Sequence, residues 1–244
     1  MSLLSVTGVS KRFGGLQAVR DLSLTVDQGE VLGLIGPNGA GKTTAFNLLS
    51  GFLRPDAGNI RFDGRSIIGW RPHAICQVGL ARTFQIVRPF PRLSVLGNVE
   101  VGALARHDDV AKAREQARAV ITQVGLGAKA DRPALGLTLA ERKRLELARA
   151  LATEPRLLLL DEVMAGLNAT ETAAIVELIK RINASGTSIL LIEHNMRAVM
   201  SLSHRIVVLS FGEKIAEGSP AMIANDPTVI QAYLGDAHVD APHG

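Results

Sequence analysis

The chain has 244 residues, 47% of them hydrophobic, and can bury the core of one large domain. Its net charge of +4 is too small to indicate a nucleic-acid surface, and no long apolar run predicts a membrane span. The single cysteine, Cys76, cannot form an internal disulfide and is expected to be a small buried hydrophobic residue. An unpaired cysteine is typical of a reducing compartment, and the first residues lack the pattern of a secretion signal.

The first thirty residues predict antiparallel strands that end at a Gln28-Gly29 turn. One face carries Leu22, Leu24 and Val26, and the other carries Ser23, Thr25 and Asp27. The continuously apolar stretch VLGLI at 31–35 is instead typical of a strand that is buried on both faces. A Gly-rich loop and a stretch of helical composition, KTTAFNLLSGF, follow it.

A second part of the chain predicts a parallel strand, helix, strand unit. Apolar strands are expected at 156–162 and from 187 onward, and the segment between them has a helical face formed by Ile175, Leu178, Ile179 and Ile182. Asn168 and Glu171 have the spacing of a helix cap, and Gly186 suits the end of that helix. The fold class is therefore α/β, with a mostly parallel core sheet and an N-terminal antiparallel β subdomain.

Residues 90–152 have helical rather than strand patterns. A helical stripe is formed by Val110, Ala113, Ala117, Val120, Ile121 and Val124. We predict one domain over 1–244, with a core of about 1–88 and 153–244 and an inserted helical subdomain of about 89–152. Near the end of the chain, Ser219-Pro220 predicts the start of a helix, and a closing helix is expected through Tyr233.

The stretch GPNGAGKTT at 36–44 matches the P-loop pattern G-x-x-x-x-G-K-[ST] and lies between a predicted strand and a predicted helix. Glycines at 36, 39 and 41 allow successive backbone N–H groups to converge on phosphate oxygens. Lys42 is expected to reach the terminal phosphates, and the Thr43 hydroxyl is expected to bind Mg²⁺. The alternative is a Gly-rich turn that fits the pattern by chance.

Polar side chains follow two other predicted strands, and a glutamine ends the short apolar-polar run LARTFQ. Asp161 is expected to face Mg²⁺, and Glu162 is expected to act as the general base on an attacking water. His194 is expected to donate to a γ-phosphate oxygen, and Gln85 to bring its amide to the metal or the water. Each of these residues could instead be an ordinary solvated or hydrogen-bonded polar residue. Their combination with the P-loop favours nucleotide hydrolysis over nucleotide binding alone.

The stretch LTLAERKRLELARAL at 137–151 admits two interpretations. Thr138 and Glu141 form a T-x-x-E capping box, which predicts the start of a helix. The same helix N-terminus offers free N–H groups and a positive dipole end to an anion, so it also suits a nucleotide contact.

In the order of these motifs, the chain resembles the ATPase subunit of ATP-binding cassette (ABC) transporters along nearly its whole length. In that family two subunits stack head to tail, and ATP lies between the P-loop of one and the signature sequence of the other. The resemblance implies an ATP-binding set in the chain's own site, formed by Phe13, Gly36, Asn38, Gly39, Ala40, Gly41, Lys42, Thr43 and Thr44. It implies signature contacts to the partner's ATP from Thr138, Ala140 and Glu141, and Mg²⁺ held by Thr43, Gln85 and Asp161.

The signature stretch departs from the usual family sequence, LSGGQ. Leu139 and Ala140 stand where glycines are common, and Glu141 stands where glutamine is usual. A methyl group at Ala140 and a negative charge at Glu141 both oppose a γ-phosphate contact. Asn168 stands where the family's D-loop usually has aspartate.

Within the family, ARTFQIVRPFPRLSVLGNVEVGA, DEVMAGLN and the C-terminal stretch resemble the branched-chain amino acid importer class. This implies a second ATPase subunit, two membrane permeases, an external solute-binding protein and a peripheral place on the cytoplasmic face of the inner membrane. The residues from Arg88 to Leu93, including Phe90, match the region that contacts the permease. The alternatives are a lipopolysaccharide-export ATPase, a soluble ABC ATPase acting on nucleic acid or ribosomes, and a subunit that binds ATP but hydrolyses it poorly.

Overall fold

The computed structural model describes residues 2–84 and 89–237, and it divides into two compact units. The first unit consists of Met1–Pro72 and Ser188–Gly244, and the second of His73–Thr187. The predicted helical subdomain, 89–152, lies within the second unit, and its limits stay a prediction. In the part of the chain that the structure describes, no helix is both long and apolar enough to cross a membrane.

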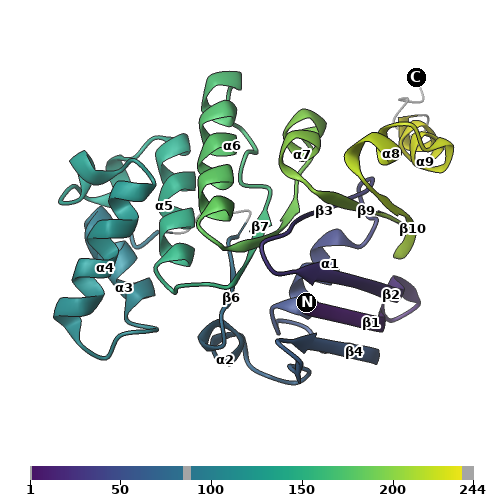
Figure 1. The fold of residues 1–244 in the computed structure, drawn as a ribbon, viewed down its shortest axis with the longest axis horizontal. Helices are drawn as coiled ribbons and strands as arrows, with labels where there is room; N and C mark the ends of the chain where they lie inside the picture. The colour runs from purple at the N-terminus through teal and green to yellow at the C-terminus, as the bar shows by residue number, and fades with distance from the viewer. Residues whose placement is uncertain (1, 85–88, 238–244) are drawn as a thin grey trace. The chain divides into compact units, whose positions relative to one another are not determined.

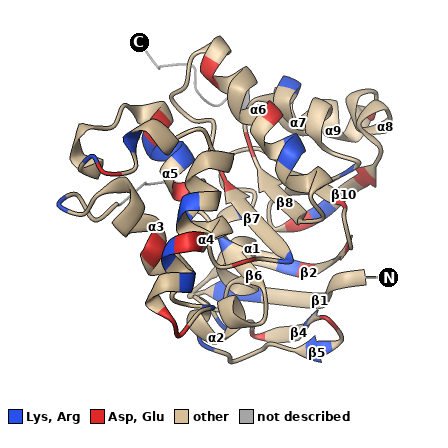
Figure 2. Ribbon diagram, turned by 60° about the vertical axis from the view of Figure 1, so that its left-hand side comes forward, with Lys and Arg blue, Asp and Glu red and all other residues tan. Residues whose placement is uncertain are grey.

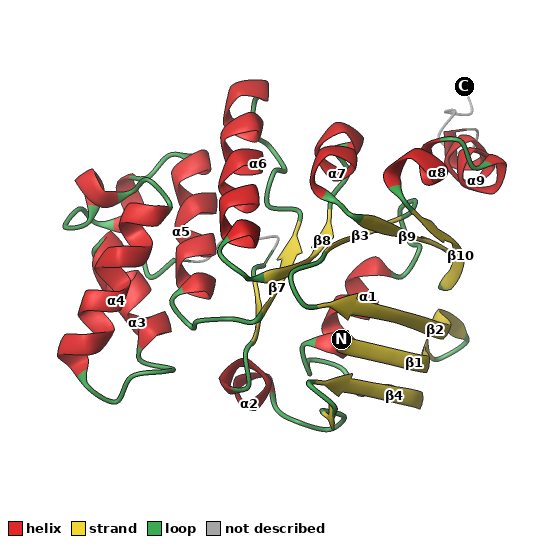
Figure 3. Ribbon diagram, viewed as in Figure 1, coloured by secondary structure: helices red, strands yellow, loops and turns green. Residues whose placement is uncertain are grey.

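The first unit contains two sheets, which Figure 3 shows in yellow. The antiparallel sheet has the order β2-β1-β4-β5 and comprises β1 (Ser2–Phe13), β2 (Leu16–Asp27), β4 (Ala57–Phe62) and β5 (Arg65–Ser66). In the other sheet, β3 (Val31–Ile35) lies parallel to and between β8 (Ser188–Ile192) and β9 (Arg205–Ser210), and β10 (Glu213–Gly218) pairs antiparallel with β9. Its helices are α1 (Lys42–Leu49), α7 (Met196–Leu202), α8 (Pro220–Ala224) and α9 (Pro227–Ala237).

The predicted alternation in β2 is confirmed, because Leu22, Leu24 and Val26 are buried. All five residues of β3 are buried, as a strand between two parallel neighbours requires. Ser219 caps α8 through a hydrogen bond from the Met222 N–H, with proline at the first helical turn as predicted.

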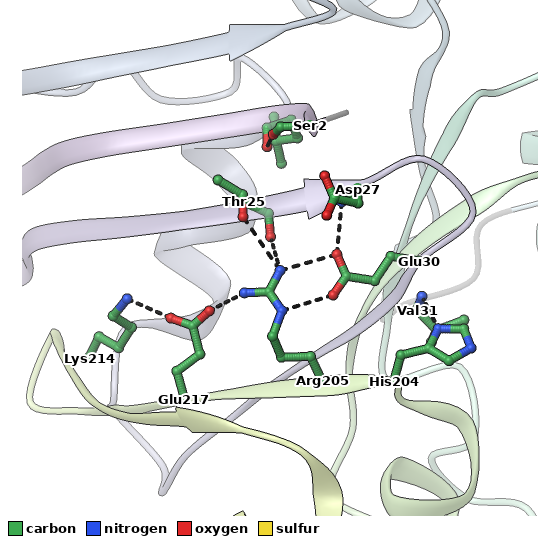
Figure 4. A network of polar contacts seen from close by, with 10 residues as sticks. Ser2, Thr25, Asp27, Glu30, Val31, His204, Arg205, Lys214 and Glu217 are labelled. Carbon is green, nitrogen blue, oxygen red and sulfur yellow. Dashed lines mark hydrogen bonds and ion pairs between the residues drawn. The ribbon is translucent and has the colours of Figure 1, made fainter.

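A half-buried polar network joins the two sheets of the first unit (Figure 4). The Arg205 guanidinium donates to both carboxylate oxygens of Glu30, at 2.9 and 3.1 Å, and to the Thr25 carbonyl oxygen at 2.7 Å. It also pairs with Glu217 on β10. The hydrogen bond with Glu30 raises the pKa of Arg205, so the guanidinium stays charged. Arg205 therefore links β2, β9 and β10 near the first residues of β3.

The second unit begins with α2 (Pro72–Gln77) at its boundary and contains one parallel strand pair, β6 (Leu80–Arg82) with β7 (Leu157–Asp161). The helices α3 (Val95–Ala103), α4 (Val110–Gln123) and α5 (Leu139–Leu151) lie side by side in Figure 1, and α6 (Ala169–Ala184) follows β7. Two short turns of 3-10 helix, Gly127–Lys129 and Ala134–Gly136, come before α5.

The predicted helical stripe of α4 is correct except at its first residue. Val110 is 67% exposed, because it lies in the first turn, whereas the later members of the stripe are buried. On α6 the predicted face of Ile175, Leu178 and Ile182 is buried, and Asn168 and Glu171 form the predicted capping box. Cys76 is only half-buried, so the expectation of a fully buried residue is wrong.

Candidate nucleotide-binding and hydrolysis site

The P-loop leaves the carboxyl end of β3 in the first unit and runs directly into α1. Gly36, Gly39 and Gly41 have φ values of 150°, 77° and 99°, which lie in the region that favours glycine. α1 begins at Lys42, with Gly41 as its N-cap residue and no side-chain cap. The first-turn N–H groups of α1 therefore have no capping side chain and suit an anion.

Neighbouring backbone holds the P-loop closely. A Cβ atom added to Gly41 would lie 2.4 Å from the carbonyl oxygen of Ala18 on β2. The Gly212 N–H, in the turn between β9 and β10, donates to the Ala40 carbonyl oxygen at 3.1 Å. The loop thus packs against both β2 and the β9–β10 turn.

The side chains of the loop divide into buried and accessible groups. Lys42 is 7% exposed, and its Nζ donates to the carbonyl oxygens of Gly36 and Pro37 at 2.6 and 2.8 Å. The predicted contact residues Asn38, Gly39 and Thr43 are exposed, Gly41 and Thr44 are half-buried, and Ala40 is buried. An accessible hydroxyl at Thr43 and an ammonium held by two backbone carbonyl oxygens of the loop fit a nucleoside phosphate with Mg²⁺.

Replacing Gly41 with alanine is expected to lower the free energy of unfolding by about 2–3 kcal/mol and to abolish ATP binding, because the added Cβ atom meets the Ala18 carbonyl. The matched control is Gly39→Ala. An added Cβ at Gly39 has no neighbour within 4 Å, so only its φ of 77° costs stability, about 1 kcal/mol. Urea unfolding and calorimetric titration with ATP compare the two variants. Equal losses in both would contradict a closely held loop.

His194 lies near the P-loop end of the sheet in the first unit. β3 and β8 run parallel with Gly33 opposite Leu191, so Gly36 and His194 both leave the same edge of this strand pair. His194 is exposed, while the preceding Glu193 is buried. Phe13, at the end of β1, exposes 46% of its surface, and the Lys11 Nζ lies over its ring, 5.7 Å from the centroid.

The predicted acidic pair lies in the second unit, at the carboxyl end of β7. Asp161 is 3% exposed, and its Oδ2 accepts from the Arg82 Nη2 at 2.7 Å. The backbone N–H of Asp161 donates to the Thr83 hydroxyl at 3.2 Å. Glu162 is half-buried and has a φ of 50°, so the chain turns sharply there and separates the directions of the two carboxylates.

Thr138 caps α5 as predicted, and the capping box with Glu141 is confirmed. One Glu141 oxygen accepts from the Thr138 N–H at 3.1 Å, and the other is hydrogen-bonded to Lys129. The hydrogen bond from Lys129 holds the pKa of Glu141 below its usual range. The negative charge that replaces the usual glutamine is therefore neutralised by a lysine and by the helix N-terminus.

The other signature residues take up two different environments. Leu139 is 48% exposed, and a Cβ atom added to Gly166 of the D-loop segment would lie 3.0 Å from its Cδ2 atom. Ala140 is half-buried in the first turn of the helix. Asn168, at the end of the D-loop segment, uses its side chain to cap α6, because its Oδ1 accepts from the Glu171 N–H at 2.9 Å.

Gln85 and Arg88 lie outside the described residues, but both flanks of this segment contact α5. Burial raises the pKa of Glu146, whose carboxylate accepts from the Phe84 N–H. Arg149 pairs with Glu146 at 3.1 Å and lies over the Phe90 ring, 5.2 Å from its centroid. One pair of side chains on α5 thus holds the residues on either side of 85–88.

Sequence reasoning missed three cations that contact the predicted site residues Asp161, Glu141 and Glu162, namely Arg82, Lys129 and Lys143. Lys143 is 4% exposed, and its Nζ donates to the Glu162 carbonyl oxygen at 3.0 Å. The only local signal was the position of Lys143 and Glu146 on a helix face that is otherwise apolar. Figure 2 shows such basic and acidic residues in blue and red on α5.

The comparisons with known sequences agree with these motifs. A family model described as ABC transporter matches residues 19–165, and one described as branched-chain amino acid ATP-binding cassette transporter matches residues 213–239. The chain is 42% identical to the high-affinity branched-chain amino acid transport ATP-binding proteins LivG of Salmonella typhimurium and BraF of Pseudomonas aeruginosa. Each alignment covers 96% of this chain and 98% of the relative. The lipopolysaccharide export system ATP-binding protein LptB of Escherichia coli is 37% identical, with 97% and 98% covered.

Solved structures show the same fold. A nucleotide-free ATP-binding cassette from an ABC transporter is 29% identical with a TM-score of 0.87, and the ADP conformation of the cassette MJ1267 is 29% identical with a TM-score of 0.88. Each similarity covers 96% of this chain and 99% of the other. The predicted fold class and family are thereby confirmed. The chain therefore belongs to the ABC transporter family and is one of its ATP-hydrolysing, nucleotide-binding subunits.

Proposed function

We propose that this chain hydrolyses ATP to drive an importer of branched-chain amino acids or related small polar solutes. The observation that carries the proposal is the similarity of residues 213–239 to the branched-chain amino acid cassette model, together with 42% identity to LivG and BraF along nearly the whole chain. Its 37% identity to LptB makes lipopolysaccharide export the less supported alternative.

We assign the predicted residues to three tasks: nucleotide binding, catalysis and Mg²⁺ binding. Lys42 and the N–H groups of the P-loop bind the phosphates of ATP, and Phe13 stacks on the adenine. Glu162 accepts a proton from the attacking water, while His194 donates to the γ-phosphate. Thr43, Asp161 and Gln85 would hold Mg²⁺, which neutralises charge on the phosphates when bound.

The signature segment is proposed to contact the ATP of a second ATPase subunit through Thr138, Ala140 and Glu141. The Lys129–Glu141 pair supports this, because it answers the objection that a bare carboxylate would repel the γ-phosphate. Thr138, at the capped start of α5, is exposed, so its hydroxyl is accessible to a second subunit. The dimer is a homodimer if the second subunit is another copy of this chain, and a heterodimer if it is a sister chain.

We also propose that the complex contains two membrane permeases, that the second unit of this chain docks on a permease at the cytoplasmic face of the inner membrane, and that an external solute-binding protein delivers the solute. Three apolar side chains near residues 85–88 support a docking surface. Phe84, Phe90 and Leu93 are 43%, 44% and 41% exposed, which is unusual for large apolar residues so close in sequence.

The test is solute uptake into proteoliposomes that contain this chain, its sister ATPase and the permeases, with Mg-ATP inside and the binding protein outside. We expect ATP-dependent uptake of labelled leucine, competed by isoleucine and valine. The matched control replaces Lys42 with methionine, which should remove uptake, because the phosphates lose their cation. Leucine uptake at the control level, in vesicles whose ATPase is active, would contradict branched-chain amino acids as the solute.

A further inference from the structure

Lys143 is a buried cation on the helix that begins with the signature segment. It is 4% exposed, although lysine is almost never buried without a partner. Its Nζ donates at 3.0 Å to the backbone carbonyl oxygen of Glu162, which lies nineteen positions further along the chain. Burying the ammonium is favourable only if it is hydrogen-bonded, so this contact is specific.

The backbone of Glu162 needs such support. Its φ of 50° is left-handed, a conformation that is strained for a residue with a side chain. The same carbonyl oxygen also accepts from the Ala165 N–H at 3.2 Å. Two donors therefore fix the direction of the Glu162 carbonyl, and through it the direction in which the side chain leaves the backbone.

Lys143 lies close to the capped start of α5, where the signature segment is. Lys143 lies little more than one turn beyond Thr138, whose side chain accepts from the Glu141 N–H and fixes the start of the helix. Glu146, one turn further on, is the buried carboxylate that faces Lys143, and Arg149 pairs with Glu146. The ammonium is therefore carried by a short, rigid stretch of helix with a balancing charge beside it.

We propose that Lys143 is a positioning residue, which holds the general base Glu162 of this chain from the helix that carries its signature. This inference rests on the proposed roles of Glu162 and of the signature. It adds that the signature end of α5 and the base in the same chain move together, because one hydrogen bond joins them. A displacement of α5 on contact with the partner's ATP would thus change the aim of the Glu162 carboxylate.

The test compares Lys143→Met, which keeps the length but removes the donor, with Lys143→Arg, which keeps both donor and charge. We expect kcat for ATP hydrolysis to fall between about tenfold and a hundredfold in Lys143→Met, with KM changed less than about twofold. Lys143→Arg should recover most of the loss. Lys180→Met is the control, because Lys180 is exposed on α6 and pairs only at the surface with Glu177.

A role through Glu162 predicts non-additivity. In a Glu162→Gln background, Lys143→Met should lower single-turnover hydrolysis no further, and Mg-ATP should bring about the same native mass in both proteins. A full further loss in that background, or a weaker ATP-dependent assembly, would overturn the proposal and indicate a general role in α5. If Glu162→Gln alone leaves hydrolysis intact, the proposed function of Glu162 fails instead. If Lys143→Met does not fold, Lys143→Gln takes its place in the same comparison.

Discussion

Replacing Glu162 with glutamine is expected to lower kcat for ATP hydrolysis by about 10²–10⁴-fold, because the attacking water loses its general base. ATP binding should change little, since the variant keeps the size of the side chain and the P-loop lies elsewhere in the chain. Steady-state hydrolysis with excess Mg-ATP and calorimetric binding of ATP measure the two quantities. Glu177→Gln, an exposed glutamate on α6 with 61% of its side chain accessible, serves as the control.

The same variant reports on the partner, because ATP that is bound but not hydrolysed should trap a closed dimer. If Mg-ATP doubles the native mass of purified Glu162→Gln, the signature segment works toward another copy of this chain. A mass that stays monomeric while ATP binds indicates that a sister ATPase supplies the second signature. Hydrolysis within about threefold of the unaltered chain would contradict the role of Glu162 itself.

Arg82→Met is expected to lower the free energy of unfolding by about 3–5 kcal/mol, because it leaves the Asp161 carboxylate buried without its cation. Arg82 and Asp161 expose only 7% and 4% of their side chains, and their ion pair measures 2.7 Å. Urea unfolding followed by circular dichroism gives the loss. The double variant Arg82→Met with Asp161→Asn should recover part of it, since the uncompensated charge is then absent.

The control for Arg82 is Arg114→Met on α4. Arg114 pairs with Glu100 at 3.2 Å, but more than half of its side chain is exposed, so this loss should stay below about 1 kcal/mol. Similar losses for Arg82→Met and Arg114→Met would show that the buried pair contributes no more than a surface pair. Nucleotide binding by the folded fraction of Arg82→Met should persist, because the P-loop lies in the other unit.

The fold was predictable where the signal is local. The alternation in β2, the continuous apolar strand β3 and the helical face of α6 each follow from residues that are neighbours in the sequence. Helix caps at Thr138 and Asn168 were equally readable, because their partners stand three residues away. Val110 and Cys76 were not, since burial at an element's end depends on packing that the pattern does not contain.

The site was predictable in its nucleotide-facing residues and missed in its supporting ones. The P-loop, Asp161 and Glu162 belong to contiguous motifs whose chemistry requires those residue types. Arg82 and Asp161 are 79 positions apart, and Lys129 and Glu141 are separated by a turn of 3-10 helix and a loop, so no local spacing links either pair. From the sequence alone, a single cation on a strand or helix is interpreted as an ordinary surface charge, because its partner becomes known only from the fold.

The division of the first unit into two chain segments has a consequence for the order of events during synthesis. β3 lies between β8 and β9, and both neighbours follow the whole second unit in the chain. At ~5–20 residues per second, the VLGLI strand waits roughly 10–30 s on the ribosome for the strands that cover its edges. An apolar strand with open edges is a template for wrong pairing during that time. The second unit is continuous in the chain and completes its β6–β7 pair earlier. The first unit is therefore most prone to wrong strand pairing while the second unit has already folded and β8 and β9 are not yet synthesised.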